Sequence, residues 1–222
     1  MRKTEFANGE YYHIYNRGVD KRDIFSNQKD YERMLETIWF VNDRRTRAGL
    51  SDHKRKLREN NLRPPRSAYA DLGGQEGLVE IICYCLNPNH YHFILKQLKE
   101  GGLSLFMGKL NNSYTKYYNI KQDRSGPLYT GKFRSIHIDS NEYLLYLSAY
   151  INGNNFIHGY NENIEDWPYS SYLDYIGKRS GKLCQKKIVL DQFKDQKEYA
   201  NFCQNNMLYL KDKKESTCYL FE

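Results

Sequence analysis

Residues 78–97 read LVEIICYCLNPNHYHFILKQ. An apolar run is interrupted by Asn87-Pro88-Asn89, a combination typical of turns, and a second apolar run follows. Two apolar runs joined by so short a turn predict a β-hairpin in which the second strand returns beside the first.

The returning strand has two unlike faces. Side chains alternate across a strand, so Tyr91, Phe93 and Leu95 share the face that would meet the core. His90 and His92 share the other face. Neutral imidazole is a common ligand of divalent metals, so the pair could bind one cation. Two half-exposed polar side chains on a solvated face would produce the same pattern.

Strands and helices alternate on both sides of this hairpin. The patterns predict strands over 10–17 and 132–139 and helices over 28–43, 103–120 and 141–151. Asp139 and Glu142 resemble a capping box that opens the last of these helices, and NGNN (152–155) should stop it. The order β-α-β-β-α-β-α indicates an α+β sandwich built on a mostly antiparallel sheet.

The length of 222 residues suits one domain with an appended tail. We expect a domain over 1–177 with a charged insertion at about 44–75. The tail over 178–222 should be helical or extended, with one helix near 189–204. The basic run Lys54–Arg58 in the insertion could contact DNA or form a solvated face.

The composition is basic and rich in tyrosine, with a formal net charge of +7 and 21 tyrosines. Basic charge with interleaved aromatic side chains suits a protein that holds phosphates and stacks on unpaired bases. Many basic proteins bind no nucleic acid, so this feature indicates a class of partner only weakly.

The chain shows no sign of export or of membrane insertion. No apolar run approaches the roughly 18 residues that span a bilayer, and MRKTEFANGEYYHIYNRG at the start lacks the apolar stretch of a signal peptide. We therefore expect a cytoplasmic protein with no membrane partner. Five cysteines, an odd number, argue against a disulfide framework, and Cys83 and Cys85 in an apolar strand favour core packing over metal binding.

The helix over 141–151 carries Tyr150 near its end, and Asn154 lies four residues further on. Residues at this spacing meet on one helical face. A phenol beside a carboxamide could provide a nucleophile and a third metal ligand. Among so many tyrosines, however, a structural role is the ordinary one.

Four segments together resemble a known family. They are YHIYNRGVDKRDIF (12–25), CLNPNHYHFIL (85–95), GPLYTGKFRSIHIDSNEYLLYLSAYI (126–151) and WPYSSY (167–172). In this order they resemble the single-tyrosine HUH transposases, and within them the REP-associated tyrosine transposases. The resemblance covers roughly residues 8–175.

The resemblance implies an RRM-like (ferredoxin-like) sheet and a metal-dependent DNA strand transferase. The family's histidine pair falls on His90 and His92, its nucleophile on Tyr150 and its polar third ligand on Asn154. The cation would be Mg²⁺ or Mn²⁺. The family has a bulky apolar residue where Tyr91 stands, and often a proline in the position that follows Asn154.

The expected substrate is single-stranded or hairpin DNA, cut and rejoined through a 5′-phosphotyrosine. The side chains expected to bind the DNA backbone are Arg17, Lys21, Arg22, Lys109, Lys116, Lys132 and Arg134. Transposases of this broad type include dimers, so a homodimer stays open. Two alternatives remain: a non-catalytic RRM-like binder that stacks bases on the tyrosines of strand 10–17, and a metallohydrolase that forms no tyrosine adduct.

Overall fold

The computed structural model describes residues 5–42, 50, 54–55 and 77–216. The core elements in chain order are β1 (Tyr11–Arg17), η1 (Val19–Lys21), α1 (Gln28–Val41), β2 (Val79–Asn87), β3 (His90–Gln97), α3 (Gly102–Lys121) and β4 (Arg134–Ile138). They are followed by α4 (Asn141–Asn152), α5 (Asn154–Ile157), η3 (Ile164–Asp166), α6 (Tyr172–Tyr175), α7 (Lys187–Leu190) and α8 (Gln196–Ser216). The expected insertion at about 44–75 lies outside the described residues except for 50, 54 and 55, and Lys54 of its basic run pairs with Glu36 of α1.

The four strands form one antiparallel sheet in the order β2-β3-β1-β4. With α1 and α3 as the two crossovers, this is the β-α-β-β-α-β arrangement of ferredoxin-like domains. The predicted hairpin is formed by β2 and β3, with Asn87 opposite His90 on either side of the turn. The α+β fold class is therefore confirmed.

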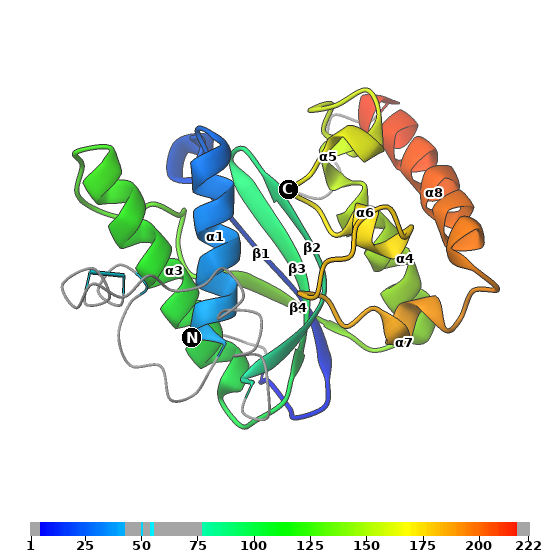
Figure 1. Cartoon of the computed structure of the whole chain (residues 1–222), viewed down its shortest axis with the longest axis horizontal. Helices are drawn as coiled ribbons and strands as arrows, with labels where there is room; N and C mark the ends of the chain where they lie inside the picture. The colour runs from blue at the N-terminus through cyan, green and yellow to red at the C-terminus, as the bar shows by residue number, and fades with distance from the viewer. Residues whose placement is uncertain (1–4, 43–49, 51–53, 56–76, 217–222) are drawn as a thin grey trace.

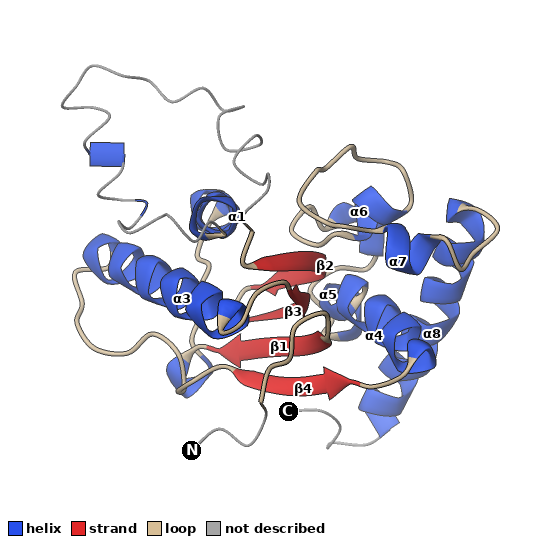
Figure 2. Cartoon of the chain, turned by 90° about the horizontal axis from the view of Figure 1, so that it is seen from below, coloured by secondary structure: helices blue, strands red, loops and turns tan. Residues whose placement is uncertain are grey.

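Helices cover both faces of the sheet, with α1 and α3 on one side and α4, α5 and α8 on the other (Figures 1 and 2). Tyr91 and Phe93 of β3 pack with Phe106 of α3 in the first layer. Ile94 of β3 packs with Leu147 of α4 in the second. A fully buried side chain of this size contributes roughly 1.5–3 kcal/mol by leaving water, so both layers stabilise the sheet.

Cys83 and Cys85 belong to the second layer and are fully buried. Burial raises the pKa of the Cys83 thiol and raises that of Cys85 to about 12, so both thiols are protonated at neutral pH. Thiolate is the form that binds metals. These positions therefore serve core packing, as the apolar strand predicts.

The edge of β2 is covered by residues 169–185. Leu86 N donates to Tyr169 O at 2.9 Å and Gln185 N donates to Ile81 O at 2.8 Å, and Ser171 contributes a further backbone bond to β2. An uncovered edge strand would present a row of unpaired backbone groups to other chains. The segment removes that risk and connects the sheet to the second helical layer.

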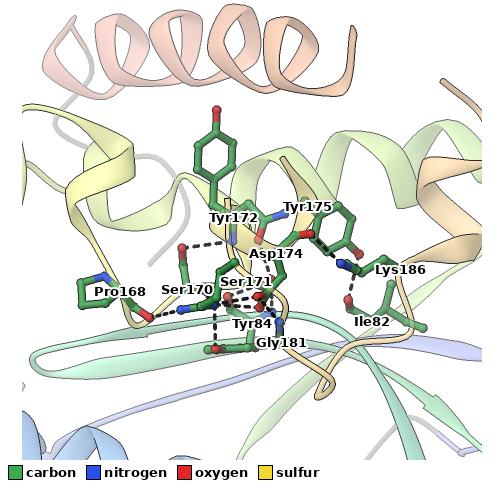
Figure 3. A network of polar contacts seen from close by, with 12 residues as sticks. Ile82, Tyr84, Pro168, Ser170, Ser171, Tyr172, Asp174, Tyr175, Gly181 and Lys186 are labelled. Atoms are coloured by element: carbon green, nitrogen blue, oxygen red, sulfur yellow. Dashed lines mark hydrogen bonds and ion pairs between the residues drawn. The ribbon is translucent and has the colours of Figure 1, made fainter. Parts of the chain in front are cut away.

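An ion pair between buried Asp174 and half-buried Arg179 holds this covering segment in shape (Figure 3). Asp174, 2% exposed, accepts from Arg179 Nε at 2.8 Å and Nη2 at 2.7 Å, and from Gly181 N at 2.9 Å. Arg179 Nη2 also donates to Ser170 O at 2.5 Å, and Lys186 Nζ to Asp174 O at 2.6 Å. Removing one partner of a buried pair strands the other charge, so the segment depends on both side chains.

The C-terminal helices differ from the expected helix near 189–204. The chain forms α7, then a turn, and α8 begins at Gln196 because Asp195 Oδ1 accepts from Glu198 N at 2.8 Å. Tyr199 and Met207 of α8 pack in the second layer against α4. The division at residue 177 remains a prediction. None of the helices in the described ranges is long and apolar enough to cross a membrane.

Candidate active site

The two histidines of β3 face the second helical layer, and Tyr150 of α4 meets them there. His90 and His92 are 8% and 6% exposed, with their ring centroids 5.2 Å apart. The Tyr150 ring lies edge-to-face with His92, at 5.7 Å between centroids. The convergence follows from strand alternation, which turns both imidazoles toward α4.

The helical face that carries Tyr150 continues through Asn154. As the sequence predicts, α4 ends within 152–155, at Asn152, but α5 follows at once because Gly153 N donates to Ala149 O and Ile157 N to Gly153 O, both at 3.0 Å. Asn154 Oδ1 consequently lies 3.0 Å from His90 Nε2. The start of α4 differs from expectation: Ser140 caps it instead of Asp139.

Asn87, the last residue of β2, completes this cluster. Its Nδ2 donates to Asn154 Oδ1 at 2.5 Å and to His90 Nε2 at 2.9 Å. The two expected ligand atoms, His90 Nε2 and Asn154 Oδ1, thus face the same NH₂ group of Asn87. This arrangement fits a divalent cation. No group of three or more His, Cys, Asp or Glu side chains in the described ranges could hold a metal, so any site here depends on amide oxygens.

Burial controls the protonation of the site. It lowers the pKa of His92 well below the ordinary value and raises the pKa of Tyr150 to about 12. The neighbouring amide of Asn154 opposes the shift of Tyr150 less strongly. At neutral pH His92 is therefore a neutral imidazole, the form that binds metals, and Tyr150 is a protonated phenol.

Helix α4 is held in position by polar contacts on its far side. Asn152 Nδ2 donates to Tyr199 Oη of α8 at 2.8 Å, and Asn152 Oδ1 accepts from Ser171 Oγ at 2.6 Å. Ser171 in turn accepts from Tyr84 N of β2 at 3.0 Å, a contact drawn in Figure 3. These bonds tie the helix that carries Tyr150 to the sheet that carries the histidines.

A solved structure of a REP-associated tyrosine transposase bound to a REP hairpin matches this architecture. The alignment covers 80% of this chain and 86% of that chain, with a TM-score of 0.51 and 16% sequence identity. The chain has the fold of a REP-associated tyrosine transposase. No family model matches the sequence, and no curated protein does.

Within this transposase fold, two of the expected DNA-binding side chains share the face of the histidines. Arg17 pairs with His90 across the sheet, and Arg134 pairs with Tyr15. Partners that stand directly opposite in an antiparallel pair lie on the same face. Both guanidinium groups therefore belong to the side of the sheet that carries Tyr150.

The other five expected DNA-binding residues lie outside the strands that carry the histidines and these two arginines. Lys109 and Lys116 belong to α3, which packs on the opposite face of the sheet. Lys132 lines a cleft against α3. Lys21 ends η1 and is exposed, and Arg22 Nε donates to Val19 O at 3.1 Å. The structure does not bring Lys109, Lys116 and Lys132 together with the histidine pair, whereas Lys21 O accepts from Asn89, the residue whose Oδ1 lies 2.6 Å from His90 Nδ1.

Four neighbours of the site were missed by sequence reasoning. They are His13, Asn87, His158 and Tyr160. His13 stands on the same face of strand 10–17 as Tyr15 and Arg17, but only the pairing of β1 with β3 places it beside His92. The sequence assigns Asn87 to the turn between the two strands of the hairpin. His158 reaches the site because it caps α5 one turn after Asn154, and its ring centroid lies 4.8 Å from that of His90.

Proposed function

We propose that this protein cleaves and rejoins single-stranded DNA as a single-tyrosine HUH transposase. One observation carries the proposal: Tyr150, His90, His92 and Asn154 come from β3, α4 and α5 and converge in one cluster. The likeness of fold to a tyrosine transposase supports it.

Tyr150 is the proposed nucleophile. Its Oη attacks a DNA phosphorus in line, and the bond between phosphorus and the 3′ oxygen breaks, leaving a 5′-phosphotyrosine and a free 3′-hydroxyl. Attack by another 3′-hydroxyl reverses the step and releases Tyr150, so no nucleotide cofactor is consumed. Because the pKa of Tyr150 is raised to about 12, its hydroxyl must lose its proton as attack proceeds.

His90, His92 and Asn154 are the proposed ligands of Mg²⁺ or Mn²⁺. When bound, the cation would neutralise charge on the scissile phosphate and polarise it for attack. Two imidazoles and an amide form a neutral ligand set, so the ion keeps its full charge toward the phosphate. The NH₂ end of the Asn87 amide faces two of these ligand atoms, His90 Nε2 and Asn154 Oδ1.

The proposed substrate is a folded single strand. The transposase of similar fold was solved with a hairpin bound. In this chain Arg17 and Arg134 supply positive charge on the site face. The four site residues all come from one chain, and a homodimer remains a prediction.

The covalent adduct tests this function. A labelled hairpin DNA with a single-stranded flank is incubated with the protein and Mn²⁺ and separated on a denaturing gel. We expect a slower-migrating protein–DNA adduct that disappears in Tyr150→Phe, while hairpin binding by that variant is retained. Cleavage without an adduct would instead support the metallohydrolase, and binding without cleavage would support the non-catalytic RRM-like binder. The latter is disfavoured because α4, α5 and α8 cover the sheet face that it would use.

A further inference from the structure

Asn87 is fully buried at the end of β2, with its amide between two expected metal ligands and a thiol. Its register partner is His90, which explains why its side chain lies on the site face. Nδ2 lies 2.5 Å from Asn154 Oδ1 and 2.9 Å from His90 Nε2. Oδ1 lies 3.5 Å from Cys85 Sγ.

Both atoms that face the Asn87 amide are acceptors. His90 Nδ1 lies 2.6 Å from Asn89 Oδ1, and Asn89 Nδ2 donates to Lys21 O at 3.2 Å, which identifies the oxygen end of that amide. His90 Nδ1 therefore carries the proton, and in the neutral ring Nε2 presents a lone pair. Asn154 Oδ1 also presents lone pairs, 3.0 Å from that nitrogen. Two lone pairs this close require a shared positive group, and the Asn87 NH₂ supplies it.

A cation bound by the same two atoms would change the role of Asn87. Its NH₂ would then face a positive charge, which is unfavourable, whereas its carbonyl oxygen would be attracted. A half-turn of the amide exchanges the two ends, and this terminal torsion is soft in asparagine. The exchange places Nδ2 beside Cys85 Sγ, and a thiol is both a weak donor and a weak acceptor. Cys85 therefore tolerates either orientation.

We infer that Asn87 is an additional ligand of the divalent cation, acting as an N–H donor to His90 and Asn154 without the ion and as an oxygen ligand with it. The inference rests on the proposed function, because it deepens the same metal site. Asparagine oxygen is a ligand that Mg²⁺ and Mn²⁺ accept. In the ion-free state the same side chain keeps the other two ligands converged.

Replacing Asn87 by aspartate separates a ligand from a mere donor. Aspartate has nearly the same shape but only accepts hydrogen bonds when ionised. If Asn87 supplies an oxygen to the ion, Asn87→Asp strengthens metal binding. If Asn87 acts only by donating to His90 and Asn154, the same substitution removes the donor and weakens it.

The experiment measures Mn²⁺ affinity of the full chain by calorimetry. We expect Asn87→Ala to weaken binding by about tenfold, and Asn87→Asp to strengthen it by a similar factor because ligand charge raises affinity. Asn112→Asp is the matched control, since it adds the same charge on the exposed surface of α3 on the other side of the sheet. Unchanged affinity in Asn87→Ala, or weakened affinity in Asn87→Asp, would overturn the inference.

Two further measurements keep the outcome decisive. In wild type, addition of Mg²⁺ should shift the side-chain ¹⁵NH₂ resonances of Asn87 as they leave both acceptors, and an unmoved signal contradicts the inference even if the variants do not fold. His90→Ala tests the proposed function separately. If His90→Ala loses Mn²⁺ binding and Asn87→Ala keeps it, Asn87 is not a ligand but the proposed metal site stands. If both variants bind Mn²⁺ as wild type does, the proposed metal site is wrong.

Discussion

His13 of β1 and His92 of β3 lie 79 residues apart in sequence and are hydrogen-bonded, with Nε2 of His13 2.8 Å from Nδ1 of His92. Burial lowers the pKa of both rings, that of His13 to about 3, so one proton lies between two neutral imidazoles. When His92 Nδ1 carries that proton, Nε2 is left with the lone pair that a cation needs. A hydrogen bond of this kind commonly selects the tautomer of a metal-binding histidine.

His13→Ala should therefore weaken Mn²⁺ binding by about tenfold, since the partner that orients His92 is lost. His13→Gln keeps a hydrogen-bond acceptor and should recover part of the affinity. Calorimetry with both variants measures the effect. Equal affinities in wild type and His13→Ala would show that His13 only fills space beside Tyr15 and Tyr150.

Acid should destabilise the fold through the same pair. His13 has a pKa of about 3 when folded, against about 6.5 for an unperturbed histidine. Between these values the unfolded chain binds the proton and the folded chain does not, so the stabilisation present above pH 6.5 is lost as the pH falls. His13 alone should lower the free energy of unfolding by about 2 kcal/mol from pH 7 to pH 5.

Urea denaturation at several pH values measures this loss, and His13→Gln provides the control. The variant should lose less stability over the same interval because one titrating ring is absent. His92, whose pKa is also lowered by burial, acts in the same direction in both proteins. Parallel pH profiles for the two proteins would contradict the assignment.

The two groups of basic residues should differ in DNA binding. Arg134 shares the site face, whereas Lys116 is exposed on α3 on the other side of the sheet. Arg134→Ala should weaken hairpin binding and reduce the slope of log affinity against log salt by about one, the value for one lost phosphate contact. Lys116→Ala should leave the slope unchanged. Fluorescence anisotropy at several salt concentrations distinguishes the two variants. A larger effect of Lys116→Ala would show that DNA binds on the face of α3 instead.

Gly153 should tolerate replacement by alanine only when the side chain of Met207 is made smaller. A Cβ at Gly153 would lie 1.7 Å from Met207 Sδ, so Gly153→Ala must displace that side chain from α8. We expect a loss of about 1–2 kcal/mol in the free energy of unfolding. In a Met207→Ala background the clash is absent, and alanine, which can adopt φ −100° at this position and restricts the unfolded chain more than glycine, should stabilise the protein by up to about 1 kcal/mol. Urea denaturation of the four proteins measures this change of sign, and the same sign in both backgrounds would show that Met207 does not contact this position.

The sequence predicts the parts of the site that depend on local periodicity. Alternation along β3 places His90 and His92 on one face, and helical spacing brings Asn154 below Tyr150. The hairpin follows from the turn residues between two apolar runs. Each of these relationships involves residues a few positions apart, whose geometry the backbone dictates almost without regard to the rest of the chain.

The sequence did not predict which distant residues would meet. His13 contacts His92 only because β1 pairs with β3 in one register, and a shift of one residue would turn His13 into the opposite layer. Packing of α3 also places Lys109 and Lys116 on the face of the sheet opposite the histidines, and their binding to DNA remains a prediction. The sequence predicted one helix near 189–204, but not that α8 would hold α4 in place through Tyr199.

The residue pattern alone predicts the antiparallel hairpin, the shared face of its two histidines and the pairing of a phenol with an amide one helical turn away. Folding of the whole chain brings Asn87 and His13 to them, places two arginines on that face and holds α4 against the sheet. Strand and helix periodicity are properties of adjacent residues. Register, layer and burial, in contrast, are set by the packing of the whole core.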